Sequence, residues 1–291
     1  MPRILDITSV QNPRIKAVLR MRKSRVRRDA EAFIAEGHRE ITRAASAGLR
    51  CIELYIVEGQ WSGRMLDELY QAAGDADRFH VTPQVIDKIA YLKEDTEGAL
   101  AIFESPQWSV EQVLAQPVEQ SEQSSPLPAR RPLWLVAEGI EKPGNLGAMA
   151  RSADAAGAAG MLVADGVVDA LNPNAIRAST GAVFSLPIAG GSSQSIRERL
   201  IACGVMIVAA SPDPAHAQQY TAIDYGQPTA IVVGAEDRGL SDVWTTVDLP
   251  HHRLASIPML GRSADSLNAS VASAVLLFEA SRQWDAKKYR T

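Results

Sequence analysis

The second half of the chain alternates short apolar runs with segments of helical spacing, and this alternation limits the fold more than any other feature. The apolar runs have the length and composition of buried strands, and we expect strands at 133–137, 160–164, 183–188, 205–210, 229–233 and 254–259. The segments between them predict helices at 146–158, 173–179, 195–203 and 240–246. Strands that alternate with helices favour an α/β fold with a mostly parallel sheet covered on both faces.

Two of the predicted strands end in loops that open toward the same edge of that sheet. One strand ends at Gly234, and Glu236 follows in its loop. The other ends with 257–259, and the segment 266–268 then opens a long apolar helix. The carboxyl ends of parallel strands are where α/β proteins bind ligands. The two loops therefore predict a ligand site.

Short patterns of spaced residues occur in both loops and in a third segment upstream. Their members are Asn145, Gly147 and Arg151 in the first, Gly234, Glu236, Gly239 and Leu240 in the second, and Ile257 to Met259 with Ser266 to Ser270 in the third. Any one pattern could arise by chance. Three of them in this order and at this spacing are a specific signal.

Together these segments resemble the motifs of the SpoU-type (TrmH-like) RNA ribose 2'-O-methyltransferases, a branch of the SPOUT superfamily. The resemblance implies a C-terminal domain with a trefoil knot, in which the last helix is threaded behind the loop near 234–240. Periodicity alone would predict an ordinary open sheet, because true knots are very rare. Ala269 departs from the family pattern, which usually has Val there, and this departure concerns packing rather than chemistry.

The resemblance also implies S-adenosylmethionine (SAM) as the cofactor, held around Gly234, Ile257, Met259 and Leu267. Without the resemblance, Ile257 and Leu267 would be read as ordinary core residues. A Rossmann-type dinucleotide site requires a G-x-G-x-x-G turn after its first strand. The segment after 133–137 is EGIEKPGNLG, which lacks that turn, and the chain has no P-loop pattern.

The residues that the resemblance assigns to catalysis are Arg151, Asn145, Glu236, Ser266 and Asn268. Arg151 is the family's proposed base, yet a guanidinium normally stays protonated. Arg151 could therefore accept the proton of the ribose hydroxyl, or it could anchor the neighbouring phosphate. Asn145 could also be a helix N-cap. Glu236 could pair with Arg151 or bind the loop that carries Asn145.

The first half of the chain predicts a smaller α/β domain at 1–104. We expect one helix that begins at residue 12 and further helices at 30–47, 63–73 and 83–91. We expect strands at 51–57, 78–81 and 98–103. The phrase FIAEGHREITRAASAG at 33–48 is similar to the RNA-binding domain that precedes the catalytic domain in many SpoU-type enzymes. Residues 105–132 are rich in Pro, Ser, Gln and Glu and predict a linker, which leaves 133–291 as the methyltransferase domain.

Charge is distributed unevenly along the chain, whose formal net charge is −4. Residues 1–28 contain nine Lys or Arg and only one acid, Asp6. A basic segment on an acidic body favours contact with a polyanion. We expect the stretch from Arg14 to Arg28 to bind RNA, although a solvated helix face is the alternative interpretation.

The remaining sequence features indicate where the protein works. Cys51 and Cys203 are far apart and lack neighbours at metal-ligand spacing, which fits a reducing cytoplasm and predicts no metal site. We identify no signal peptide and no apolar run of the roughly 20 residues that a membrane span needs. The five histidines lie outside the three patterns, and we expect them to be structural or solvent-facing.

The sequence features and the resemblance together predict a cytoplasmic, SAM-dependent RNA 2'-O-methyltransferase, and the resemblance implies a homodimer. The resemblance places the active site near the subunit interface, and the apolar segment from Val271 to Phe278 is a candidate for that interface. We expect 23S ribosomal RNA as the substrate, in either a housekeeping or an antibiotic-resistance role. The alternatives are methylation of a tRNA ribose and a non-catalytic RNA-binding or ribosome-assembly factor.

Overall fold

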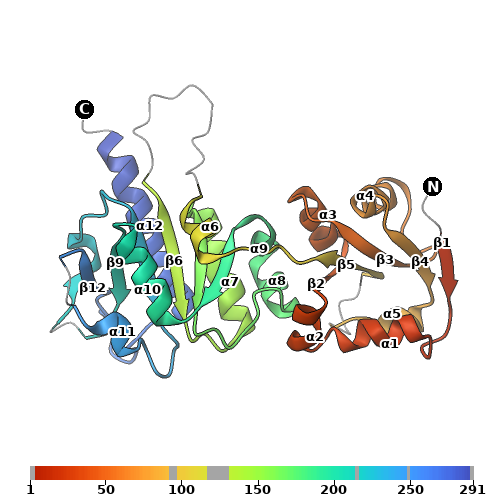
Figure 1. Ribbon diagram of the computed structural model, residues 1–291, viewed down its shortest axis with the longest axis horizontal. Helices are drawn as coiled ribbons and strands as arrows, with labels where there is room; N and C mark the ends of the chain where they lie inside the picture. The colour runs from red at the N-terminus through yellow and green to blue at the C-terminus, as the bar shows by residue number, and fades with distance from the viewer. Residues whose placement is uncertain (1–3, 92–96, 117–130, 214–215, 248–249, 289–291) are drawn as a thin grey trace. The chain divides into compact units, whose positions relative to one another are not determined.

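A computed structural model describes residues 4–91, 97–116, 131–213, 216–247 and 250–288 of the chain (Figure 1). The chain forms two compact units. Unit 1 comprises Met1–Pro106 and Leu171–Ser185, and unit 2 comprises Gln107–Ala170 and Leu186–Thr291. Each unit contains one sheet.

Unit 1 is built on a five-stranded mixed sheet. Its strands in spatial order are β1 (Ile4–Ile7), β4 (Asp77–Val81), β3 (Cys51–Val57), β5 (Ala99–Glu104) and β2 (Ala32–Glu36). The first three are parallel, whereas β5 is antiparallel to both β3 and β2.

Helices cover both faces of this sheet, with α1 (Pro13–Arg20) and α5 (Pro83–Ile89) on one face and α3 (His38–Ser46) and α4 (Gly63–Ala73) on the other (Figure 1). The apolar side chains of α1 and α5 complete a core with Tyr55 and Phe79 of the sheet. The short helix α2 (Ser24–Asp29) follows α1.

The helix predicted over 30–47 is wrong over its first eight residues, 30–37. Ala32–Glu36 is strand β2, and the helix α3 begins only at His38. Phe33 and Ala35 are fully buried, and the whole strand pairs antiparallel with β5. The Ala and Glu residues of this stretch favour a helix locally, but burial in a sheet overrides that preference. Gly37, with φ +86°, makes the turn between strand and helix.

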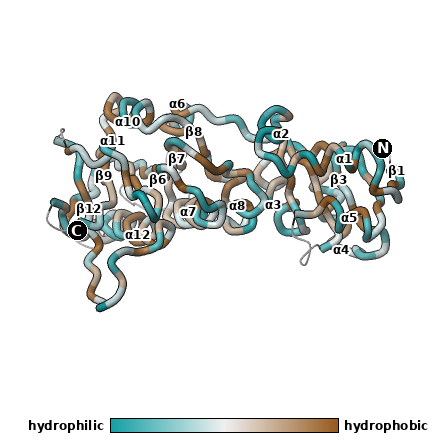
Figure 2. Tube along the Cα trace, turned by 90° about the horizontal axis from the view of Figure 1, so that it is seen from below, coloured by the Kyte–Doolittle hydropathy of each residue, from teal (hydrophilic) through white to brown (hydrophobic). Residues whose placement is uncertain are grey.

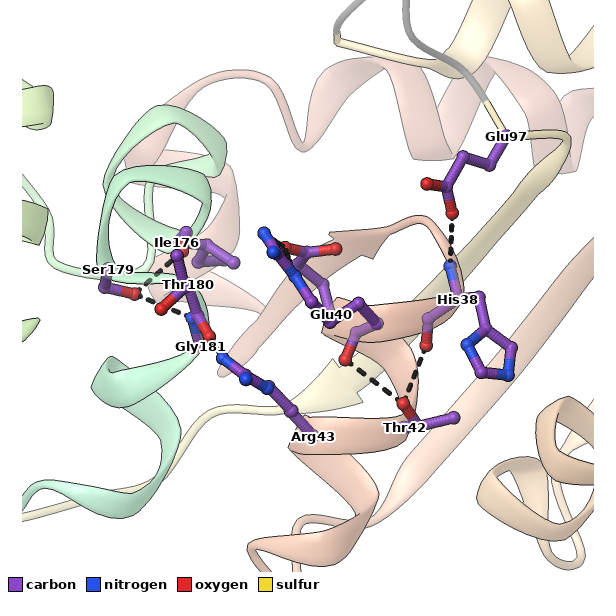
Figure 3. A network of polar contacts seen from close by, with 10 residues as sticks. His38, Glu40, Thr42, Arg43, Glu97, Ile176, Ser179, Thr180 and Gly181 are labelled. Carbon is purple, nitrogen blue, oxygen red and sulfur yellow. Dashed lines mark hydrogen bonds and ion pairs between the residues drawn. The ribbon is translucent and has the colours of Figure 1, made fainter.

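The segment Leu171–Ser185 lies between two strands of the second sheet in sequence but packs within unit 1. It forms α8 (Pro173–Ser179) and α9 (Ala182–Ser185). The Phe184 ring stacks on Phe33, with 5.3 Å between ring centroids. Arg43 of α3 donates to the Thr180 carbonyl oxygen at the end of α8 (Figure 3). The strand predicted over 183–188 is therefore wrong, since a strand (β8, Ile188–Gly191) begins only after Pro187.

Unit 2 is built on a seven-stranded sheet in which every described strand pair is parallel. The spatial order is β10 (Gln218–Gln219), β12 (His252–Ser256), β9 (Met206–Ala210), β11 (Thr229–Val233), β6 (Leu133–Glu138), β7 (Gly160–Ala164) and β8. The chain runs outward from β6 to β8 and then crosses to the other side of β6. This change of direction is a topological switch point.

Helices also cover both faces of the second sheet, on opposite sides of β6, β7 and β9 (Figure 2). On one face lie α7 (Pro143–Ala155) and α12 (Ala269–Lys288), which pack against each other. On the other lie α6 (Val110–Leu114), α10 (Ser193–Ala202) and α11 (Asp242–Thr245). The predicted α/β fold with a parallel sheet is confirmed.

The predicted linker at 105–132 contains structure near its start. Ser109 and the helix residue Gln112 form a reciprocal capping box at the start of α6. Val113 is fully buried, and its carbonyl oxygen accepts from the Trp134 indole N–H at 3.1 Å. The buried Val113 side chain therefore anchors α6 in a segment whose composition predicted no helix. Residues 117–130 of the predicted linker lie outside the described residues.

Candidate active site

A pocket of about 360 Å³ lies at the carboxyl ends of β9, β11 and β12. Its walls combine apolar side chains with exposed backbone of the loops that follow these strands. Lining residues from the predicted cofactor set are Gly234, Ile257, Met259 and Leu267, and Ser266 of the predicted catalytic set also lines it. The strand before Ile257 ends at Ser256, so 257–259 belong to the loop rather than to the strand as predicted. The pocket lies at the predicted edge of the sheet.

The loop after β11 is folded tightly on itself. Its backbone closes through a bridge between Ala235 and Gly239, in which the Gly239 N–H donates to the Ala235 carbonyl at 2.9 Å. A side chain at Gly234 would collide with the backbone of Gly239 and Leu240. Glycine is therefore required at 234 to close the loop, rather than for close approach of a ligand. Glu236 in this closed loop lines the pocket.

Three polar side chains from separate segments meet beside this pocket. The Asn268 amide N–H donates to the Asn145 side-chain oxygen at 3.3 Å and also donates to the Glu236 carboxylate. Lys142 donates to the other oxygen of the Glu236 carboxylate at 2.6 Å. Residues from the start of α7, the loop after β11 and the start of α12 thus form one hydrogen-bonded group.

The charge of Glu236 is stabilised mainly by Lys142. The Lys142 ammonium, followed by the Asn145 side chain, holds the pKa of Glu236 below its usual value. In turn, Glu236 raises the pKa of Lys142. The neighbouring Arg238 pairs with Glu141, so both basic residues near the loop are engaged by acids. Glu236 is therefore an ionised hydrogen-bond acceptor.

Asn268 has a second role at the start of α12. Its side-chain oxygen accepts from the Ser270 N–H at 3.0 Å and from the Ser270 hydroxyl at 2.6 Å. The side-chain amide group is thereby fixed with its N–H donors toward Glu236 and Asn145. This orientation requires an amide, because a carboxylate at 268 could not donate.

The structure does not bring Arg151 into this group. Helix α7 begins at Pro143 with Lys142 as its N-cap, so Asn145 lies inside the first turn, and the alternative interpretation of Asn145 as the N-cap does not hold. Arg151 lies six residues further on, about 120° around the helix from Asn145. It is exposed, and the described residues include none that forms a hydrogen bond or ion pair with it. The pairing considered between Glu236 and Arg151 is replaced by the pairing with Lys142.

The basic stretch Arg14 to Arg28 divides into structural and outward-facing residues. Arg14 pairs with Glu53 and stacks over Phe79, Arg22 donates to the Ala90 carbonyl, and Arg27 is buried with a 2.8 Å hydrogen bond to the Met21 carbonyl. The exposed members are Lys16, Arg20, Lys23, Arg25 and Arg28. Helices α1 and α2 therefore form a packed basic surface rather than a free arm.

Two histidines in the described chain serve structure. His38 pairs with Glu68 at 2.9 Å and stacks on Trp61, and His252 is buried against the Trp244 carbonyl. Among the described residues, no three or more His, Cys, Asp or Glu side chains cluster so as to hold a metal ion. None of the described helices combines the length and apolar character needed to cross a membrane.

The fold and the pocket define a parallel α/β protein with a ligand site at the carboxyl ends of β9, β11 and β12. Comparison with known proteins gives its family. The SpoU rRNA methylase family profile matches residues 132–278, and an MRM3-like substrate-binding domain profile matches residues 12–101. The chain belongs to the SpoU rRNA methylase family. The predicted family and the predicted class of enzyme, a SAM-dependent RNA 2'-O-methyltransferase, are confirmed.

Individual relatives match nearly the whole chain. A 23S rRNA (uridine(2479)-2'-O)-methyltransferase from Streptomyces viridochromogenes is 30% identical and aligns over 92% of this chain and 88% of its own length. An AdoMet-bound rRNA methyltransferase structure from Sinorhizobium meliloti is 26% identical with a TM-score of 0.80, covering 96% and 98% of the two chains. An RNA 2'-O ribose methyltransferase structure is 36% identical with a TM-score of 0.74 and the same coverage.

Sequence reasoning missed two residues at this site. Lys142 lies 94 positions from Glu236, and no local pattern links them. Asp265 lines the pocket directly before the Ser-Leu-Asn pattern. Its position next to that pattern was the available signal, together with the general preference of a cationic ligand for acidic walls.

Proposed function

We propose that this protein transfers the methyl group of SAM to a ribose 2'-hydroxyl of large-subunit ribosomal RNA. The observation that carries the proposal is the joining of Asn145, Glu236 and Asn268 beside the pocket. Similarity to the Streptomyces viridochromogenes 23S rRNA enzyme supports the choice of RNA.

The volume, the apolar lining and the charge of the pocket suit SAM as the methyl donor. Its volume of about 360 Å³ lies within the range of small-molecule sites, roughly 300–1,000 Å³. Leu240, Ile257, Met259 and Leu267 offer apolar walls, and loop backbone offers hydrogen-bonding groups. The ionisable lining residues are two acids, Glu236 and Asp265, without a base. SAM supplies a methyl group on a positively charged sulfonium, which these acids complement.

The polar group beside the pocket positions the acceptor. An alcohol is a weak nucleophile, so the ribose must be held in line with the methyl group while its proton is removed or shared. Asn145 and Asn268 present amide groups that hydrogen-bond a ribose, and Glu236 with Lys142 fixes their orientation. Ser266, exposed on the pocket rim, adds a hydroxyl.

Arg151 acts in the site of the partner subunit of a homodimer. Its exposure and its angle away from Asn145 on α7 support this role. The neighbouring α12 presents two large apolar residues to solvent, Val271 at 46% and Phe278 at 50% exposure, on one face of the helix. These two residues support an interface on this face of α12. There the guanidinium binds the phosphate next to the target ribose or accepts the hydroxyl proton.

The knot implied by the family resemblance belongs to the same proposal. The last helix, α12, packs on α7 and β11, and Asn268 at its start bonds to the loop after β11. We further infer that the protein works in the cytoplasm, with the substrate domain at 1–104, the linker at 105–132 and the catalytic domain at 133–291. The exposed basic side chains of α1 and α2 bind RNA phosphates.

Transfer of a labelled methyl group tests this function. Purified protein is incubated with [methyl-³H]SAM and, separately, with ribosomal RNA, ribosomal subunits or tRNA, and the label is mapped to a 2'-O-methyl nucleotide by its resistance to alkaline hydrolysis. We expect label in large-subunit RNA. Label in tRNA alone would select the tRNA alternative. Intact SAM binding without transfer to any RNA would select a non-catalytic RNA-binding factor.

The physiological role is tested by growth. Cells with and without the protein are compared for the mapped ribose methylation and for sensitivity to ribosome-targeting antibiotics. A housekeeping enzyme leaves drug sensitivity unchanged when it is removed, whereas a resistance enzyme does not.

A further inference from the structure

Glu138 is a buried carboxylate at the carboxyl end of β6 that the proposed chemistry does not use. The residue is 6% exposed. In the described part of the chain, no Lys, Arg or His is in ion-pair contact with it. A buried charge without a counter-ion is costly unless hydrogen bonds satisfy it.

Four donors satisfy this carboxylate. The Ser193 and Ser241 hydroxyls each donate to Oε1 at 2.6 Å, and the Trp244 indole N–H donates to the same oxygen at 3.0 Å. The Ser241 backbone N–H donates to Oε2 at 2.9 Å. Hydrogen bonds to a charged acceptor are the stronger kind, so this arrangement fixes the positions of its donors.

The two serine donors come from different elements, one from a helix away from the pocket and one from the end of a pocket loop. Ser193 opens α10, none of whose residues lines the pocket. Ser241 directly follows Leu240, the last pocket residue of the loop that carries Glu236. The other end of that loop is fixed by the sheet, because Val233 pairs with Ala137, the residue before Glu138. Glu138 therefore lies next to the residue where the loop begins, and its hydrogen bonds to Ser241 fix the position where the loop ends.

We propose that Glu138 is a positioning residue for donor binding. Its two hydrogen bonds to Ser241 fix the end of the loop 234–240 next to β6, so that Glu236 and Leu240 keep their places at the pocket. This inference rests on the proposed function, since it assumes that the pocket binds SAM. It assigns to Glu138 no contact with the donor or the reacting atoms.

Two matched variants separate positioning from general stability. Ser241→Ala and Ser193→Ala each delete a hydroxyl that donates to the same carboxylate oxygen at the same distance. SAM affinity is measured by titration calorimetry, and thermal unfolding is measured in parallel. Glu138→Gln, which turns one acceptor into a donor facing existing donors, is the third variant.

We expect both Ser variants to unfold at similarly lowered temperatures while their donor affinities differ. Ser241→Ala should weaken SAM binding about ten-fold, the equivalent of one lost hydrogen bond to a charged group, and Ser193→Ala less than about two-fold. If Glu138→Gln folds, it should weaken SAM binding at least as much as Ser241→Ala.

Equal effects of the two Ser variants on SAM binding, or no effect of either, would overturn the positioning role and leave the proposed function intact. Failure of the wild-type protein to bind SAM would overturn both. The two failures are thus distinguishable in one set of titrations.

Discussion

Asn268 and Glu236 lie 32 residues apart in the chain, and the side-chain amide of the first donates directly to the carboxylate of the second. The bond joins the start of α12 to the loop after β11, and Asn145 extends it to α7. Three segments that resemble family motifs are thus connected by their own side chains. The connection lies beside a pocket of suitable size for a methyl donor.

Lys142 should control the ionisation of Glu236. In Lys142→Met the pKa of Glu236 should rise toward its ordinary value, because the main cause of its lowering is removed. Since the folded pKa is lowered, the charged form stabilises the protein above the ordinary pKa of Glu, and this contribution is lost as the pH falls through the lowered value. NMR titration of the side-chain carboxyl carbon measures the shift.

The control for Lys142 is Arg238→Met. This variant removes a neighbouring surface pair with Glu141 but leaves the Lys142 contact with Glu236. In this variant the pKa of Glu236 should stay at its wild-type value. A shift of the same size in both variants would show that general surface charge, rather than Lys142, governs Glu236.

Arg151 should act across the dimer. The Arg151→Ala and Glu236→Ala variants should each lack transfer activity when assayed separately. When the two variants are mixed in equal amounts and refolded together, the mixture should show about a quarter of the wild-type activity. Random pairing makes half of the dimers mixed, and each mixed dimer has one complete site. A mixture as inactive as its parts would place Arg151 and Glu236 in the same subunit's site.

Phe278→Asp in both chains of that mixture should abolish the recovery, because it charges the exposed face of α12. Ile201→Asp is the matched control, since Ile201 is an apolar residue of α10 with 37% exposure. Sedimentation of each variant reports the oligomeric state. Recovery that survives Phe278→Asp would remove α12 from the interface.

Asp265 should favour the charged donor over its neutral product. SAM carries one more positive charge than S-adenosylhomocysteine, and Asp265 is an acid of the pocket wall. Asp265→Asn should weaken SAM binding about three- to ten-fold, as expected for one partly screened charge pair, and should alter binding of the product little. Calorimetry with both ligands measures the ratio. Equal losses for both ligands would assign Asp265 to a group that they share.

The basic surface of α1 and α2 should set the salt dependence of RNA binding. Replacing Lys16, Arg20, Lys23, Arg25 and Arg28 by Gln should weaken binding and reduce the slope of log K against log salt by up to about 0.7 per lost contact with single-stranded RNA. By contrast, Arg27→Gln should lower the unfolding temperature, because Arg27 is buried. An unchanged slope in the five-fold variant would place the RNA elsewhere.

The parallel sheet and the position of the pocket were predictable from sequence because strands buried on both faces are continuous apolar runs. Residues 133–137 and 230–233 are such runs, and they lie in the buried strands β6 and β11. The polar residues that meet at the pocket were predictable only through the family resemblance. Periodicity contains no information about which loops meet side chain to side chain.

The errors arose where tertiary contacts override local preference. Residues 32–36 form a strand because β5 offers them a partner, and α6 forms within the predicted linker because Val113 is buried. The sequence predicts that the whole basic stretch is one charged surface. In the structure, however, Arg14 and Arg22 form hydrogen bonds with residues 39 and 68 positions away. The Lys142 partner of Glu236 is a further case of the same kind.

The most direct test of the account is to measure methyl transfer and SAM binding together in Asn268→Ala. We predict that transfer to large-subunit RNA falls about a hundred-fold or more, the scale seen when an oriented hydrogen-bond donor is lost from an active site, while the dissociation constant for SAM changes less than about three-fold. Retained transfer, or loss of SAM binding equal to the loss of transfer, would contradict the assignment of this group to the ribose.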